Sequence, residues 1–153
     1  MARESPVRLV IEHDILDAIH YEPMDDRALL PRLFEQFPNL GLCVDTGRVH
    51  LQEVTDPRFD AVRFTSMMLP YITNVHLWTV HVGTNRLGGH HPVLPSLRKE
   101  DGWGDMAGLL WVLASLQHTH VLFEHNADVL AAGQLDECYS WVASALSGSG
   151  PGK

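Results

Sequence analysis

Acidic and imidazole side chains end four short apolar runs of this sequence. Glu12 ends the first run, in "VIEHD", and Asp45 ends the second, in "CVDTG". His81, in "WTVHVGTNR", and Glu124, in "LFEHN", end the third and the fourth. Two glutamates, an aspartate and one imidazole are a hard, oxygen-rich ligand set that suits a divalent cation such as Mn²⁺, Mg²⁺, Co²⁺ or Zn²⁺. The pattern predicts one such ion, bound by these four residues.

A shared site requires the four runs to be neighbouring strands. The carboxyl ends of parallel strands lie on one rim of an α/β fold, so the four side chains would converge there. Without a cation, three carboxylates at such short range would repel one another, and at least one would be driven towards protonation. A single carboxylate after a strand, such as Asp45, is more often a helix N-cap. A carboxylate or an imidazole at the end of all four strands favours the joint site.

The apolar patterns predict strands and helices in strict alternation. Each strand candidate is a nearly continuous apolar run, typical of a sheet covered on both faces or of the inside of a barrel. Each helix candidate has apolar residues at helical spacing, and the second has Pro57 in its first turn. The expected strands are 7–12, 40–45, 74–82 and 120–124, the expected helices are 25–37, 57–69, 105–117 and 135–146, and 83–104 is a loop. This order predicts the α/β class, as a parallel (βα)4 unit.

Length and composition place the chain among ordinary globular proteins. Its 153 residues suit one domain, expected over 1–147, and the Gly- and Ser-rich end at 148–153 is expected to be disordered. The net charge of -8 argues against nucleic acid as a partner. Cys43 and Cys138 lie in apolar segments and are expected to be buried thiols of a reducing compartment. With no run of membrane-spanning length, a cytoplasmic location is expected.

The four motifs, together with "VRLVIEHD" and "LGLCVDTGRVH" around the first two, resemble the second half of the xylose-isomerase-like TIM barrels. That superfamily includes sugar and sugar-phosphate isomerases, ketose 3-epimerases and apurinic endonucleases. The resemblance covers 7–147 and implies the same metal quartet. It also implies that Glu12 and Glu124 act as the acid/base pair in proton transfer at carbon, while the metal polarises the substrate oxygens. Arg86, in "VHVGTNR", then corresponds to a substrate contact.

One position departs from the family pattern. The aspartate is usually followed by Thr-x-His, whereas Arg48 stands here in place of that histidine. An arginine cannot ligate a metal but binds carboxylate or phosphate, so an anionic substrate is indicated. The missing histidine and the acidic balance make an apurinic-endonuclease-like phosphodiesterase the weaker alternative. The other alternative is a non-catalytic half-barrel that binds a metabolite or pairs with a partner.

Two further histidines compete for roles at the rim. His76 is the alternative metal ligand, but it lies nearer the middle of the expected strand 74–82 than His81. The two histidines are five positions apart, an odd number, so alternation along one strand would point them to opposite faces. His91, in the loop "GGHHPVLPS", is a candidate contact for substrate or for a second metal.

A complete barrel has eight βα units, and four are expected here. A half-barrel leaves two strand edges and half of the interior exposed. We therefore expect either a homodimer or a complementary N-terminal half-barrel to close the structure, around a small carbohydrate substrate.

Overall fold

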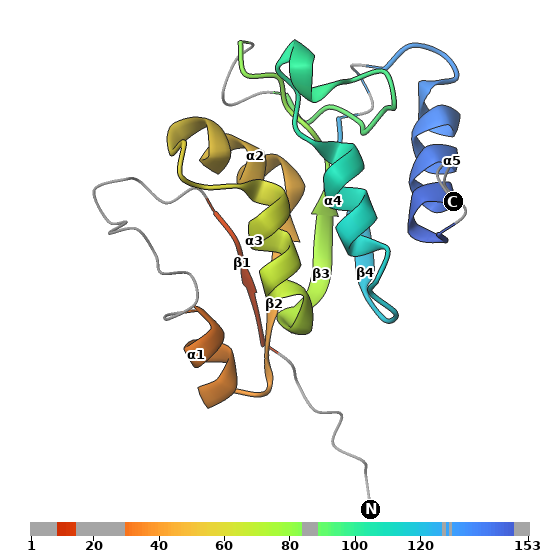
Figure 1. Ribbon diagram of the computed structural model, residues 1–153. Coiled ribbons are helices and arrows are strands. Elements are labelled where there is room, and N and C mark those ends of the chain that lie inside the picture. Colours follow the sequence, from red (N-terminus) through yellow and green to blue (C-terminus); the bar gives the residue numbers. More distant parts are fainter. Residues whose placement is uncertain (1–8, 15–29, 84–88, 127, 129, 149–153) are drawn as a thin grey trace, which may run out of the picture.

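The computed structural model describes residues 9–14, 30–83, 89–126, 128 and 130–148 (Figure 1). Its strands form one parallel sheet in the order β1-β2-β3-β4. They are β1 (Leu9–Glu12), β2 (Leu40–Asp45), β3 (Ile72–Leu77) and β4 (His120–Phe123). The α/β class and the four parallel strands are confirmed. A parallel sheet whose strands follow in chain order is consistent with half of a barrel.

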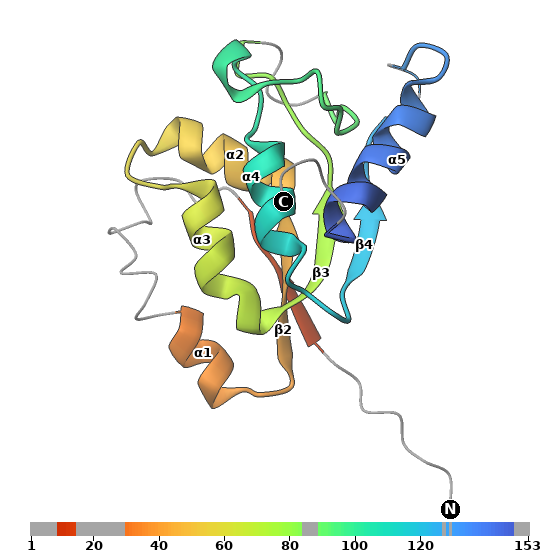
Figure 2. The same cartoon turned by 45° about the vertical axis from the view of Figure 1, so that its right-hand side comes forward.

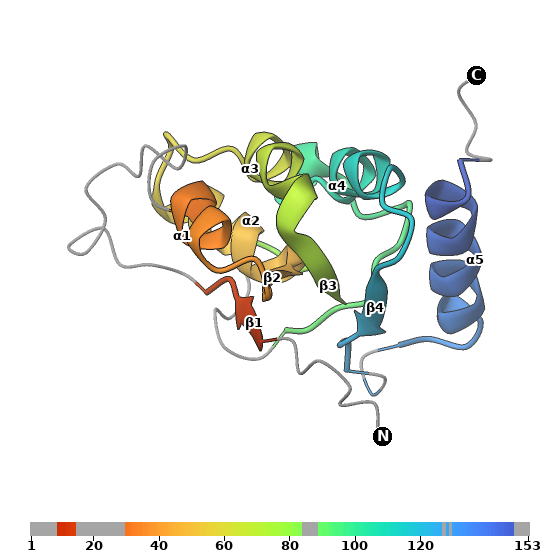
Figure 3. The same cartoon turned by 90° about the horizontal axis from the view of Figure 1, so that it is seen from below.

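The helices lie on one side of this sheet. They are α1 (Leu30–Gln36), α2 (Thr46–Thr55), α3 (Ala61–Met68), α4 (Met106–Leu113) and α5 (Gln134–Leu146), with short 3-10 turns η1 (Leu69–Tyr71) and η2 (Lys99–Asp101). Seen from below the sheet, α1 to α4 form a layer over the strands, and α5 stands beside β4 (Figure 3). Figure 2 shows α3, α4 and α5 following one another across this layer.

The expected strict alternation is wrong between β2 and β3, where two helices stand in place of one. Asp45 caps α2 and Asp60 caps α3, each accepting a hydrogen bond from the backbone N–H three residues on. Pro57 precedes the Asp60 cap, so it lies between the helices and not in the first turn of the second one. The segment 46–55 has few strongly apolar residues, and for this reason its helical period was not evident.

Alternation along the strands divides the sheet into two faces. Leu42, Val44, Val75 and Leu77 belong to the hydrophobic core beneath the helices, together with residues such as Phe64. Because successive side chains of a strand point to opposite faces, the residues between them face away from the helices. In β2 these include Cys43 and Asp45, and in β3 they include Asn74 and His76.

The expected strand 74–82 ends five residues early, at Leu77. Beyond that point the chain leaves the sheet and pairs with the loop before α4. Thr79 forms an antiparallel bridge with His91, and His81 forms one with Trp103. The loop therefore offers partners that the fourth strand does not, and this is why the strand stops.

The outer strands have open edges within the described residues. The apolar side chains of Leu9, Val10 and Ile11 in β1 are exposed, and so is Leu122 in β4. None of the helices in the described ranges has both the length and the apolar character needed to cross a bilayer.

Candidate metal centre

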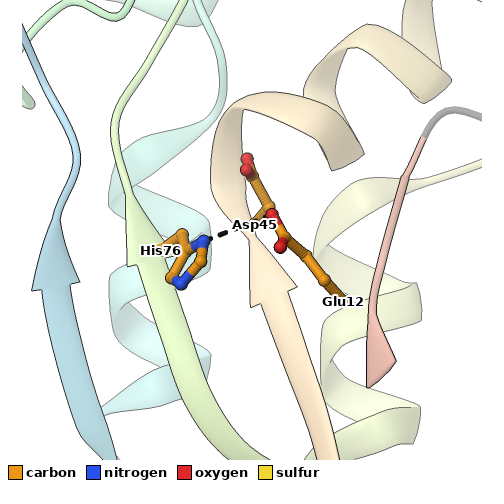
Figure 4. Close-up of side chains that lie close together, drawn as sticks. All are labelled: Glu12, Asp45 and His76. Carbon is orange, nitrogen blue, oxygen red and sulfur yellow. Dashed lines mark hydrogen bonds and ion pairs between the residues drawn. The ribbon is translucent and has the colours of Figure 1, made fainter. Parts of the chain in front are cut away.

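Glu12, Asp45 and His76 come together on the face of the sheet that points away from the helices (Figure 4). Each offers one ligand atom, and these atoms all lie within 4.8 Å of one another. The closest contact joins His76 Nδ1 to Glu12 Oε1 at 3.2 Å. The three residues come from β1, β2 and β3, so the sheet order alone brings them to one place.

Glu124 lies close to the same imidazole. Its Oε2 lies 3.4 Å from His76 Nδ1. The residue directly follows β4, and its N–H donates to the carbonyl of Leu77 at 3.2 Å, which extends the strand pairing by one step. The side chains of Glu12 and Glu124 therefore both reach one imidazole nitrogen, and within the described part of the chain the group of mutually close ligand atoms consists of Glu12, Asp45 and His76.

The strand register accounts for this convergence. Asp45 pairs with His76 across β2 and β3, and Glu12 pairs with Cys43 across β1 and β2. Paired residues of parallel strands point to the same face, and so do residues two apart on one strand. The register therefore places Glu12, Asp45 and His76 on one face without any bulge between the ligating positions.

The carboxylate of Asp45 caps α2 and is also one of the three candidate metal ligands. Its Oδ1 accepts the Arg48 N–H at 2.9 Å and so caps α2. The residue is only 1% exposed, and this burial raises the pKa of its carboxyl, against the effect of the Arg48 N–H. A buried carboxylate next to Glu12 gains from a bound cation, which would offset both its lost hydration and the repulsion. The N-cap role of Asp45 is therefore compatible with a second role as a metal ligand.

The structure does not bring His81 into this group. Its Nε2 lies 2.9 Å from the carbonyl oxygen of Asp101, and its Nδ1 accepts the Gly83 N–H at 3.0 Å. The expectation that His81 ends the third strand is therefore wrong, because β3 has already ended at Leu77. His76, the alternative ligand, is the imidazole that lies at the strand ends.

The predicted substrate contacts lie at different distances from the group. Arg48 is nearby, with its Nε 4.0 Å from Asp45 Oδ2, and its Nη1 donates to Asp14 Oδ1 at 2.6 Å. His91 packs edge-on against Trp103, with ring centres 5.1 Å apart. Burial lowers the pKa of His91, and the nearby His81 lowers it further. Arg86 lies outside the described residues.

The sequence did not predict the aromatic stacking of Trp78 and His90, which follows the strand ends. Trp78, two residues after His76, stacks on His90 with ring centres 3.8 Å apart. His90 Nδ1 lies 2.8 Å from the carbonyl oxygen of Glu124. The dipeptide Thr46-Gly47 after the capping aspartate was the available signal, because glycine at the start of a helix allows close approach of another group.

Cys43 also lies on the ligand-bearing face. Its burial, with the negative charges of Glu12 and Asp45 nearby, raises the pKa of the thiol to about 11. The expectation that Cys43 and Cys138 are buried free thiols is confirmed. Its thiol is not part of the group of close ligand atoms, so the carboxylate oxygens and the imidazole are the candidate donors.

The donor set fits a divalent cation. Carboxylates with one imidazole suit Mn²⁺, Mg²⁺, Co²⁺ or Zn²⁺. Glu12, Asp45 and His76 form a group that could hold a metal ion. No protein-family model, no curated protein and no solved structure matches this chain.

Proposed function

We propose that this protein is a divalent-metal-dependent sugar or sugar-phosphate isomerase or epimerase that moves a proton at carbon. The observation that carries the proposal is the placement of Glu12 and Glu124, at 3.2 Å and 3.4 Å, around the same His76 nitrogen. Two carboxylates that reach one ligand position could serve as acid and base for a small substrate bound there. The resemblance of the strand-end motifs to xylose-isomerase-like barrels supports the same reaction class.

In this proposal Glu12, Asp45, His76 and Glu124 hold the ion. When bound, the ion polarises the carbonyl and hydroxyl oxygens of the substrate as a Lewis acid. One of Glu12 and Glu124 takes the proton from the carbon next to the carbonyl group. The other returns a proton, to the opposite face in an epimerisation. Asp45, buried and tied to α2, is the ligand that is fixed in position.

Arg48 is the proposed anion contact of the substrate. Its side chain is 39% exposed and lies beside the buried Asp45 carboxylate. The ion pair with Asp14 occupies one Nη group, which leaves other donors of the guanidinium for a phosphate or carboxylate. A sugar phosphate bound there would compete with the exposed carboxylate of Asp14 for the arginine.

We also propose that further strands close the sheet into a barrel. The apolar residues Leu9 and Val10 on β1 and Leu122 on β4 are exposed at the outer strands. Pairing of both edges, either with a second copy or with a complementary half-barrel, would bury these side chains and the partly exposed Glu12. This closure would also limit the access of bulk water to the metal centre.

Hydrogen–deuterium exchange at carbon tests the proposed chemistry directly. The protein, loaded with Mn²⁺, Mg²⁺, Co²⁺ or Zn²⁺ in turn, is incubated in D₂O with a panel of ketoses and ketose phosphates. NMR, after removal of the protein and the ion, would then show deuterium at the carbon next to the carbonyl group. Glu124→Gln should abolish this exchange, whereas Glu137→Gln on α5 should not. A metal-loaded protein that exchanges no proton in any of these sugars would contradict the proposal.

A further inference from the structure

Trp78 is buried against the first turn of α2. The side chain is 3% exposed. Its backbone N–H donates to Thr46 Oγ1 at 3.0 Å, and the same hydroxyl donates to the Trp78 carbonyl oxygen at 2.6 Å. The indole lies directly against Gly47, where an added Cβ would overlap its ring atoms. One side of the ring is therefore fixed by the first turn of α2.

The other side of the indole is covered by His90. The two rings are stacked, with an interplanar angle of 18°. His90 is itself fixed, because its carbonyl oxygen accepts the Asn126 N–H at 2.8 Å and its Nδ1 lies 2.8 Å from the Glu124 carbonyl oxygen. The stack thus connects the segment after Asp45 with the segment after β4. Movement of the indole is restricted from both faces.

The indole N–H has no hydrogen-bond partner within the described part of the chain, although it is buried. A buried donor without a partner costs about 1–3 kcal/mol, so a suitably placed acceptor would stabilise the protein. The carboxylate next to this contact is Asp45, which directly precedes Thr46 and Gly47, the two residues that hold Trp78.

We propose that Trp78 is a positioning residue of the metal centre: its indole N–H donates to the Asp45 carboxylate when a divalent ion is bound there. Asp45 Oδ1 already accepts the Arg48 N–H, so a second donor would fix the plane of the carboxylate and still leave lone pairs for the ion. The inference rests on the proposed metal centre and adds a residue that orients one of its ligands. Donors behind a ligand act in this way at many metal sites, and their removal lowers metal affinity about 10–100-fold.

The test compares two tryptophan substitutions by titration with Zn²⁺. Trp78→Phe keeps an aromatic ring against Gly47 and His90 but removes the N–H, whereas Trp111→Phe, on the exposed face of α4, is the matched control. Binding that survives in Asp45→Asn is background and is subtracted. We expect Trp78→Phe to bind Zn²⁺ about 10–100-fold more weakly than wild type, with an unchanged circular dichroism spectrum, and Trp111→Phe to bind as wild type does.

A second measurement needs no variant of Trp78. In wild-type protein labelled with ¹⁵N, the indole resonance of Trp78 should move downfield when Zn²⁺ is added, as its proton becomes hydrogen-bonded. Unchanged affinity in Trp78→Phe, or an indole resonance that stays in place while Zn²⁺ binds, would overturn the inference alone. A wild-type protein that binds no more Zn²⁺ than Asp45→Asn would overturn the metal centre as well.

Discussion

His76 and Glu12 are 64 residues apart in the sequence, and their side chains meet at 3.2 Å across the strand that lies between them. The intervening strand, β2, contributes Asp45 to the same group. A contact between the first and third strands requires long side chains that point to one face, at the ends of strands with matched register. The sheet order β1-β2-β3 supplies these conditions, so the candidate site is a direct consequence of the topology.

Substitution of Asp45 should separate its two roles. Asp45→Asn keeps an oxygen that can cap α2 but removes the negative charge, so we expect metal binding to be lost while the metal-free protein remains at least as stable as wild type at pH 7. The reason is that burial raises the pKa of this carboxyl, so its ionisation at neutral pH opposes folding. Asp45→Ala should in addition lose about 0.5–2 kcal/mol from the missing cap. Urea denaturation and Zn²⁺ titration of both variants measure the two effects, and retained binding in Asp45→Asn would contradict the assignment.

Gly47→Ala should destabilise the protein although it improves helix propensity. At an ordinary helical position the exchange would stabilise by about 1 kcal/mol, because glycine is the poorer helix former. Here the new methyl group would overlap the Trp78 indole, and overpacking of this kind costs about 1–3 kcal/mol. Thermal or urea denaturation gives the sign of the change. In a Trp78→Leu background, Gly47→Ala should lower the free energy of unfolding by less than it does in wild type. Equal effects of Gly47→Ala in the two backgrounds would argue against this steric contact.

Stability should fall in acid because of His13. Its ring lies against Phe64 and Phe59, with ring centres 4.9 Å and 5.9 Å apart, and burial lowers its pKa from 6.5 to about 4. Between these two values the unfolded chain binds a proton that the folded protein does not. The free energy of unfolding therefore decreases as the pH falls through this window, by up to about 3 kcal/mol.

His13→Phe keeps an aromatic ring in this position and removes the proton. Urea denaturation at several pH values between 7 and 4 should show a shallower loss of stability in this variant than in wild type. His118→Phe, at an exposed position, should keep the wild-type slope. Equal slopes in wild type and His13→Phe would show that His13 is not the group responsible.

Much of the fold could be predicted from the sequence because its strands are short, continuous apolar runs. Strand β2 occupies its expected range, and β4 begins where expected and ends one residue early. Asp105, at the start of the expected helix 105–117, caps α4. Helix α2 was missed because its sequence, "TGRVHLQEVT", mixes polar and apolar residues without a clear helical stripe. In the structure Asp45 caps α2, and its carboxylate also lies in the group of close ligand atoms with Glu12 and His76.

The choice between His76 and His81 could not be made from periodicity. The residues after Leu77 continue an apolar, strand-like pattern, "WTVHV", and nothing local marks the end of β3. The strand ends because Thr79 and His81 pair with the loop near His91 and Trp103, a contact between distant segments. Registers between strands, such as Asp45 with His76, also depend on the whole sheet. These long-range pairings are what a single sequence does not display.

The most direct test of the metal centre compares the two rival histidines. Wild-type protein, His76→Gln and His81→Gln are purified, supplied with a slight excess of Zn²⁺, and analysed by native mass spectrometry together with elemental analysis. We expect about one ion per chain in wild type and in His81→Gln, and loss of that ion in His76→Gln. The same spectra report whether the chain is a dimer, as a closed barrel of two copies would require. A wild-type protein without bound ion, or loss of the ion in His81→Gln with retention in His76→Gln, would contradict the account.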